Sequence, residues 1–226
     1  MSKFILLILI SLIGFACKSQ TKINEDLKNQ LDSILLQDQI FRAYIDNQTT
    51  DIRKSEISKL VGYTKDYLDH NIWLLITKTD SINLQSVEKI IQLYGYPGKS
   101  MVGEPTNTAA FLVIQHSPKI SKYYPLIEAA GKDGEIPFTD VAMMLDRKLT
   151  EERKPQVYGT QLEGKLITDD QTGKKHQVIY VLPIKNANKV NSRRKKAGFE
   201  TTVEENAKRF GIEYKKYTYE EIDKMN

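Results

Sequence analysis

The sequence contains a single cysteine, Cys17, so no disulfide bond can form within the chain. It also lacks the short motifs of well-known chemistry, with no GxSxG, no HExxH and no phosphate-binding P-loop. Its longest apolar run, residues 4–13, is shorter than the about 20 residues that a transmembrane helix needs. Internal repeats and low-complexity tracts are missing too. These absences exclude a disulfide framework and a repeat architecture, and they leave the chemistry open.

The balance of basic and acidic side chains does not indicate which class of partner the protein binds. The chain carries 33 basic and 29 acidic side chains, and this ordinary balance favours no class of ligand. Residues 193–196 are consecutive basic residues, which in a cytoplasmic protein would suggest a nucleic-acid patch. Because residues 1–17 have the pattern of an export signal, we expect no nucleic-acid partner.

The N-terminus reads as an export signal. Lys3 precedes the apolar run, and small residues lead into Cys17. Residues 1–17 resemble the signal of bacterial lipoproteins, which implies cleavage before Cys17 and its lipidation, with residues 18–22 as a tether. Lys18 then favours the outer membrane, facing the periplasm or the surface. The alternative is an ordinary cleaved signal in which the cysteine is incidental.

Hydrophobic periodicity predicts a mainly α-helical (α+β) fold in a single domain, residues 23–226, with a late β-hairpin at about 156–182. The predicted strands are 156–162 and 176–182, with a turn at 169–173 and a bulge or close approach at Gly159. The predicted helices are 23–45, 51–78, 84–93, 106–116, 120–130, a helix beginning at 139 or 140, 187–197, 203–210 and 219–224. Gly62 is a possible weak point of the second, and Asp80 or Asn83 is the expected cap of the third.

Residues 94–116 are the stretch around which we expect the fold to be organised. A glycine- and proline-rich loop leads into residues 109–114, which are apolar on every side and therefore predict a fully buried helix. Thr106 or Asn107 is the expected cap. Gln115 and His116 end that helix, so their polar atoms lie near the interior and need partners.

Two further pairs of charged residues occur on apolar helices. Asp38 and Arg42 are four residues apart, so they can form an internal salt bridge, or Asp38 can be a buried acid held ready for a ligand. Asp146 and Arg147 are adjacent and point about 100° apart on a helix, so at most one of them can share a ligand with His116. The other would brace the scaffold.

Four motifs in order, GYPG (residues 95–98), VIQH (113–116), LDR (145–147) and YGTQ (158–161), are followed by a paired arginine. Together with Asp38, Gln39 and Arg42, they resemble an uncharacterised family of bacterial domains, often lipoproteins, over about residues 32–198. The resemblance implies no activity. The positions that it picks out are Gln115, His116, Asp146, Arg147, Tyr158, Gly159, Thr160, Gln161 and Arg194.

Three functions remain open. The first is a polar pocket around His116, in which Asp38, Arg42, Gln115, Tyr158, Thr160, Gln161 and Arg194 hold a small anionic or polar ligand. The second is a hydrolase-like enzyme in which His116 is the general base. Asp146 or Asp38 would orient the imidazole, and Arg147 or Arg194 would stabilise negative charge. The nucleophile would be Thr160, Ser100 or water. The third is a structural or partner-binding envelope lipoprotein. No metal or cofactor is predicted, and the oligomeric state stays open.

Overall fold

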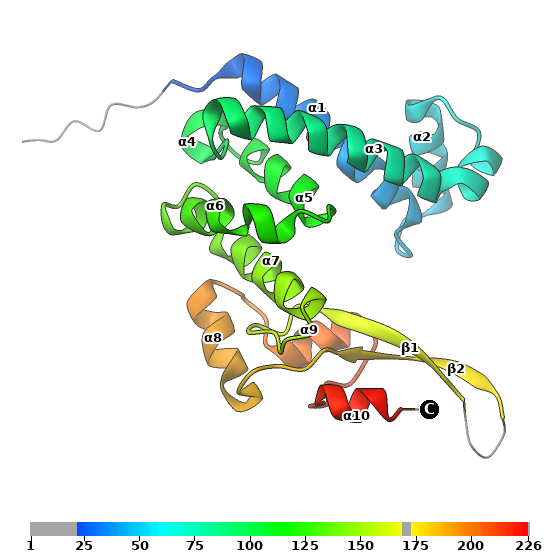
Figure 1. The fold of residues 1–226 in the computed structure, drawn as a ribbon. Helices are drawn as coiled ribbons and strands as arrows, with labels where there is room; N and C mark the ends of the chain where they lie inside the picture. Colours follow the sequence, from blue (N-terminus) through cyan, green and yellow to red (C-terminus); the bar gives the residue numbers. More distant parts are fainter. Residues whose placement is uncertain (1–21, 169–172, 226) are drawn as a thin grey trace, which may run out of the picture.

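The computed structural model describes residues 22–168 and 173–225, and it is mainly helical with one antiparallel hairpin late in the chain (Figure 1). This confirms the predicted fold class. Cys17, the signal and most of the tether lie outside the described residues, as does most of the predicted hairpin turn.

Helices α1 (Glu25–Ile45) and α3 (Lys65–Tyr94) run antiparallel along one edge of the molecule, with α2 (Asp51–Val61) at one end (Figure 1). The chain leaves α2 at Gly62, whose φ of 73° is the left-handed conformation that glycine adopts without strain. Thr64 then begins α3 by accepting a hydrogen bond from the Tyr67 amide. A glycine and a capping threonine therefore define this corner.

The separate helices predicted at 51–78 and 84–93 are wrong. The first is divided at Gly62, and the second is the end of α3, so Asp80 and Asn83 lie inside a helix and do not cap one. Residues 65–94 contain no glycine or proline. Cap-type polar residues alone do not stop a helix whose other side chains are buried by its neighbours.

Helix α5 (Ala109–Gln115) lies beneath α1 and α3, at the centre of the main core (Figure 1). Burial of its apolar residues confirms that prediction. It follows a short helix α4 (Lys99–Val102) and a 3₁₀ turn η1 (Thr106–Thr108). The predicted cap is wrong: neither Thr106 nor Asn107 caps α5, because the Thr106 hydroxyl donates to Asp32 and the Asn107 amide donates to the Glu135 carbonyl.

Helices α6 (Ile120–Lys132) and α7 (Phe138–Glu151) pack on the other side of α5. Glu88 connects α3 to α6. Its carboxylate accepts hydrogen bonds from Lys119 Nζ at 2.8 and 2.7 Å and from the Tyr123 hydroxyl at 2.7 Å. The hydrogen bonds from Lys119 and Tyr123 lower the pKa of Glu88 from 4.5 to about 2.

We expect this carboxylate to make stability depend on acid. Because its pKa is lower in the folded state, its contribution is complete above pH 4.5 and is lost as the pH falls towards about 2. Allowing for solvent screening, the loss should be about 1–2 kcal/mol. Urea unfolding over this pH range should show a shallower pH dependence for Glu88→Gln than for the wild type. Equal slopes would assign the acid sensitivity to other carboxylates.

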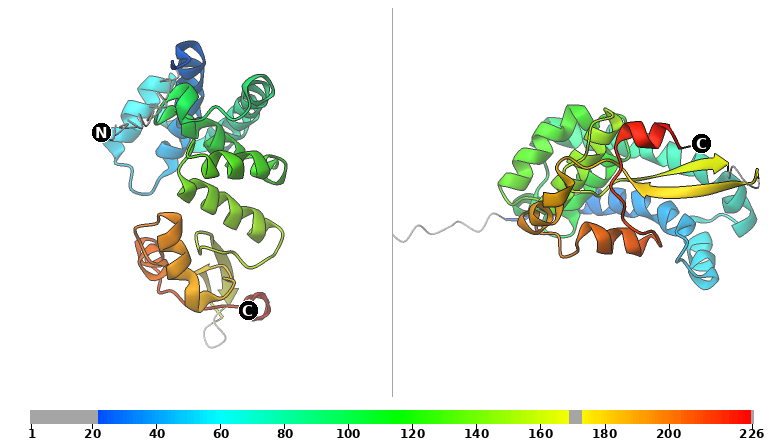
Figure 2. Two further views of the ribbon diagram at one scale, coloured as in Figure 1. Left: turned by 90° about the vertical axis from the view of Figure 1, so that its left-hand side faces the viewer. Right: turned by 90° about the horizontal axis from the view of Figure 1, so that it is seen from below.

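The last part of the chain packs below α7 and ends with the C-terminus near the hairpin (Figures 1 and 2). Strands β1 (Leu162–Thr168) and β2 (Lys175–Val181) pair antiparallel, with Leu162 opposite Val181. Two small apolar clusters join β2 to the following helices. The elements that follow β2 in the chain are η2 (Ala187–Lys189), α8 (Val190–Ala197), α9 (Val203–Arg209) and α10 (Tyr219–Asp223).

The prediction that residues 156–162 form the first strand is wrong, and so is the bulge within it, but the alternative of a close approach at Gly159 is confirmed, since an added Cβ would lie 2.7 Å from Ile184 Cδ1. Residues 156–161 form a loop, in which Gly159 has a φ of 72°. The backbone amides of Val157, Tyr158, Thr160 and Gln161 donate to the side chains of Asp146 and Gln156, so they are not available to a β-ladder. Gln156 itself forms an isolated bridge with Ile184. The strand begins only where that local pairing ends.

Candidate functional site

The imidazole of His116 is held by a buried carboxylate. His116 follows α5, and its Nδ1 lies 3.2 Å from Oδ1 of Asp38 on α1. Asp38 is fully buried, whereas the His116 side chain keeps 18% of its exposure. The carboxylate therefore fixes the ring through Nδ1 and leaves Nε2 on the opposite edge.

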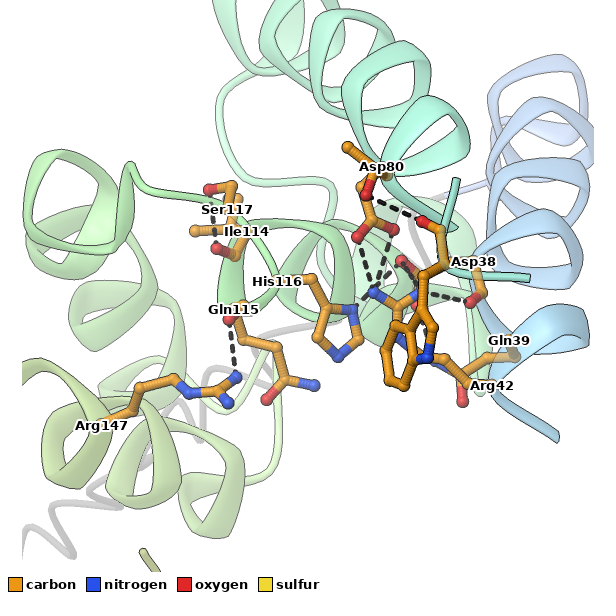
Figure 3. Close-up of polar contacts among 11 residues, drawn as sticks. Asp38, Gln39, Arg42, Asp80, Ile114, Gln115, His116, Ser117 and Arg147 are labelled. Carbon is orange, nitrogen blue, oxygen red and sulfur yellow. Dashed lines mark hydrogen bonds and ion pairs between the residues drawn. The ribbon is translucent and has the colours of Figure 1, made fainter. Parts of the chain in front are cut away.

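Two side chains fix Asp38 in turn. Gln39 Nε2 donates to Asp38 Oδ2 at 2.6 Å, and Arg42 Nη1 donates to the Asp38 backbone carbonyl at 2.7 Å and lies 3.5 Å from its Oδ1. Arg42 Nη2 also donates to both oxygens of Asp80 on α3, at 2.9 Å each. The predicted pairing of Asp38 and Arg42 is thus part of a larger network joining α1, α3 and α5 (Figure 3).

Arg147 reaches the same region from α7. Its Nη1 donates to the Gln115 carbonyl at 2.8 Å, and Figure 3 shows Gln115 and Arg147 on one side of the imidazole, with Asp38 and Arg42 on the other. Within the described residues, this carbonyl is the sole partner of the guanidinium. Nε2 of His116 and the side-chain amide of Gln115 have no hydrogen-bond partner among the described residues. Several half-buried polar groups therefore remain available for a ligand.

Asp146 belongs to a different cluster. Its fully buried carboxylate accepts hydrogen bonds from the amides of Val157, Tyr158 and Thr160 and from the Thr160 hydroxyl, at 2.7–3.1 Å. Burial raises the pKa of Asp146, while the hydrogen bonds from these groups act in the opposite direction. Adjacent residues of α7 thus separate as helix geometry requires, with Asp146 holding the loop and Arg147 lying towards His116.

The remaining predicted residues hold the same loop from its other side. Arg194, on α8, donates from Nη1 to the Tyr158 carbonyl at 2.9 Å and from Nε to the Thr201 carbonyl at 2.7 Å. Gln161 donates its backbone amide to Gln156 Oε1, and its side chain donates to the Thr160 hydroxyl. Tyr158 packs its ring against Phe199, with ring centres 6.0 Å apart, and burial raises the pKa of its hydroxyl.

The structure therefore divides the predicted site residues into two groups. The first, which we call the His116 site, consists of Asp38, Arg42, Gln115, His116 and Arg147. The second, which we call the Asp146 loop cluster, consists of Asp146, Tyr158, Thr160, Gln161 and Arg194. Ser100 joins neither group, because it is exposed on α4 and its amide donates to Glu135.

Sequence reasoning missed several members of these networks. Asp80, which pairs with Arg42, follows Ile76 and precedes Val87 at helical spacing, so treating 65–94 as one helix would have placed it beside the buried face. Gln156 and Arg193 were also missed. Gln156 bonds the Gln161 and Leu182 carbonyls, and Arg193 bonds the Val157 carbonyl, contacts for which the local sequence gives no signal.

Comparison with known protein families matches residues 26–214 to a family of unknown function, DUF6624. The chain belongs to this family. Membership of the DUF6624 family confirms the predicted relation to a family without an assigned activity, while its lipoprotein character stays a prediction. No curated protein and no solved structure matches the chain.

Among residues 22–168 and 173–225, no helix has both the length and the apolar character that crossing a bilayer requires. The same residues contain no group of three or more histidine, cysteine, aspartate or glutamate side chains suited to a metal ion. Around Asp38 and His116 lie two arginines, Arg42 and Arg147, and two glutamines, Gln39 and Gln115.

Proposed function

We propose that this protein is a lipid-anchored envelope protein that binds a small anionic ligand at the His116 site. The sequence of residues 1–17 supports the envelope location. The observation that carries the binding proposal is the set of polar groups left over around the imidazole. Arg147 uses one N–H on the Gln115 carbonyl, and the rest of its guanidinium has no partner within the described residues.

The charges around the site favour an anion. Asp38 and Asp80 are both engaged with Arg42, so the acids near His116 already have a cationic partner. Arg147 has no carboxylate within ion-pair distance among the described residues. A guanidinium in this position suits a carboxylate or phosphate, which accepts two parallel N–H bonds, and the Gln115 amide and His116 Nε2 add further polar contacts.

A second function, hydrolysis, rests on one observation. A buried carboxylate bonded to Nδ1 is the arrangement that orients a general-base histidine. Within the described residues, no hydroxyl or thiol lies within hydrogen-bonding distance of the His116 ring, so the nucleophile in this alternative would be water. Binding needs no such additional participant, and it is the function that the geometry supports best.

Thermal shift and calorimetry on residues 17–226 with Cys17→Ser test this proposal. A panel of acetate, succinate and inorganic phosphate should contain at least one anion that raises the wild-type midpoint. Arg147→Ala should weaken its binding about tenfold or more, because a charge-assisted hydrogen bond contributes about 1.5–3 kcal/mol. His116→Ala should weaken it as well.

Arg53→Ala is the matched control, since Arg53 is exposed on α2 and pairs only with Glu56 among the described residues. It removes the same charge and should leave the affinity unchanged. If no anion shifts the midpoint, or if all three variants lose affinity equally, the His116 site is a structural network. Should a bound anion ester also be cleaved, and cleavage stop in His116→Ala, hydrolysis replaces simple binding.

A further inference from the structure

A surface cavity is lined by residues of α7, α8, α9 and the segments beside them, none of which belongs to the His116 site. It encloses about 510 Å³, between the first half of α7, the segment 198–201 and the end of α9. A volume of this size is typical of small-molecule sites. Thr139 and Met143 contribute from α7, and Arg194 and Phe199 contribute from α8 and the segment after it.

The buried wall of this cavity contains a cation without a direct counter-ion. The Arg194 side chain is only 2% exposed, and its three hydrogen bonds go to the Tyr158 carbonyl, the Thr201 carbonyl and the Thr201 hydroxyl, all of which are neutral. No carboxylate lies within ion-pair distance of it among the described residues. The Tyr158 peptide alone connects Arg194 to the carboxylate of Asp146.

Burial without an ion pair is costly for a guanidinium, and burial lowers the pKa of Arg194, while the more distant charges of Asp146, Glu204 and Glu205 act in the opposite direction. The face of Phe199 lies 4.5 Å from the guanidinium carbon, which offsets part of that cost. Arginine also carries more N–H donors than these three bonds use. An anion in the cavity would add a negative charge in direct contact with the guanidinium and accept the remaining donors.

The outer part of the cavity offers both polar donors and apolar surface. Arg209 and Asn206 on α9 line it, and neither side chain has a partner within the described residues. Beside them, Phe210 is 57% exposed, and the Met143 side chain faces the same space. Cationic donors at one side and aromatic and thioether surface at the other fit a ligand with an anionic group at one end and an apolar group at the other.

We propose that this cavity binds an organic carboxylate that carries an apolar chain, with the carboxylate towards Arg194 and Arg209 and the chain against Met143 and Phe210. The site is independent of the one around His116. Glu200, an exposed carboxylate, also lines the cavity and opposes an anion there. The proposal therefore fixes the sign of two charge effects: Arg209 strengthens binding and Glu200 weakens it.

Methionine methyl NMR tests the proposal directly. The chain from residue 17 on, with Cys17→Ser, keeps every residue that the structure describes and contains Met101, Met143, Met144 and Met225. With ¹³C-methyl-labelled methionine, hexanoate should shift the Met143 signal, assigned through Met143→Leu, in a saturable way. Met101 and Met225, which do not line the cavity, are internal references. Acetate and hexanol should each bind more weakly than hexanoate, since each lacks half of the proposed recognition.

Three variants decide the charge contributions without disturbing Arg194. Arg209→Gln should weaken hexanoate about tenfold, and Glu200→Gln should tighten it. Lys208→Gln, which removes a neighbouring exposed charge that does not line this cavity, should have no effect. The Met143 response should persist in His116→Ala, which separates this site from the His116 site. An unmoved Met143 signal at millimolar hexanoate overturns the proposal, as does equal binding of hexanol or equal loss in Arg209→Gln and Lys208→Gln.

Discussion

Replacing Asp146 by alanine is expected to lower the free energy of unfolding by about 4 kcal/mol, the range found when one partner of a buried charged network is removed. The variant would leave the amides of Val157, Tyr158 and Thr160 buried without their acceptor. It would also remove the group that fixes the loop 156–161 to α7. Urea-induced unfolding of the wild type and the variant measures this difference.

Two comparisons make the measurement specific. Asp133→Ala removes an exposed carboxylate at the end of α6 and should cost less than about 1 kcal/mol. Asp146→Asn keeps one acceptor oxygen in nearly the same volume, so its loss should be intermediate. If Asp146→Ala unfolds at the same urea concentration as Asp133→Ala, the loop is not held by this carboxylate, and its amides have found water.

The elements that could be predicted from the sequence are those whose cause is local. Residues 109–114 are apolar on every side, which favours a buried element, and the cap-type residues before the run together with Pro118 after it favour a helix. The start of α9 is equally local, because Thr202 and Glu205 form a capping box with each other's backbone amides. The mainly helical fold class follows from patterns of this kind.

The errors occurred where distant residues decide. Asp80 and Asn83 look like caps, yet α3 continues through them because the apolar residues on either side are buried against other helices, and Asp80 pairs with Arg42, 38 positions away in the chain. The 156–162 segment has the β-branched and aromatic composition of a strand. Its peptide groups are hydrogen-bonded instead by Asp146 on α7, which precedes the segment, and by Arg194 on α8, which follows it. The periodicity within the segment does not predict these contacts.

The candidate site shows the same division. Residue chemistry singled out Asp38, Arg42, His116 and Arg147, because polar groups on apolar helices need partners. Which partner each would take depended on the packing of α1 against α5, across 78 positions for Asp38 and His116. Helix geometry did predict that Asp146 and Arg147 would point in different directions, but only the tertiary structure decides which of them lies near the imidazole.

Gly159→Ala is expected to lower the free energy of unfolding by about 3 kcal/mol, of which strain at positive φ accounts for about 1. At Gly159, with φ of 72°, an added Cβ would lie 2.7 Å from Ile184 Cδ1 and 2.8 Å from Val203 Cγ2. Gly62 has nearly the same φ, 73°, and a Cβ added there would have no neighbouring atom within 4 Å. Gly62→Ala is therefore a matched control that carries the strain without the collision.

The difference between these two variants measures how tightly the loop 156–161 is packed against Ile184 and α9. We expect about 2 kcal/mol by urea unfolding, because Val203 is fully buried and cannot move aside without disturbing its own cluster. Equal losses would mean that the loop yields at no cost, and that its hydrogen bonds to Asp146 and Arg194 fix its backbone without fixing its distance from α9. In that case the loop could also adjust to a ligand in the adjoining cavity, and the Met143 signal of Gly159→Ala should respond to hexanoate as the wild type does.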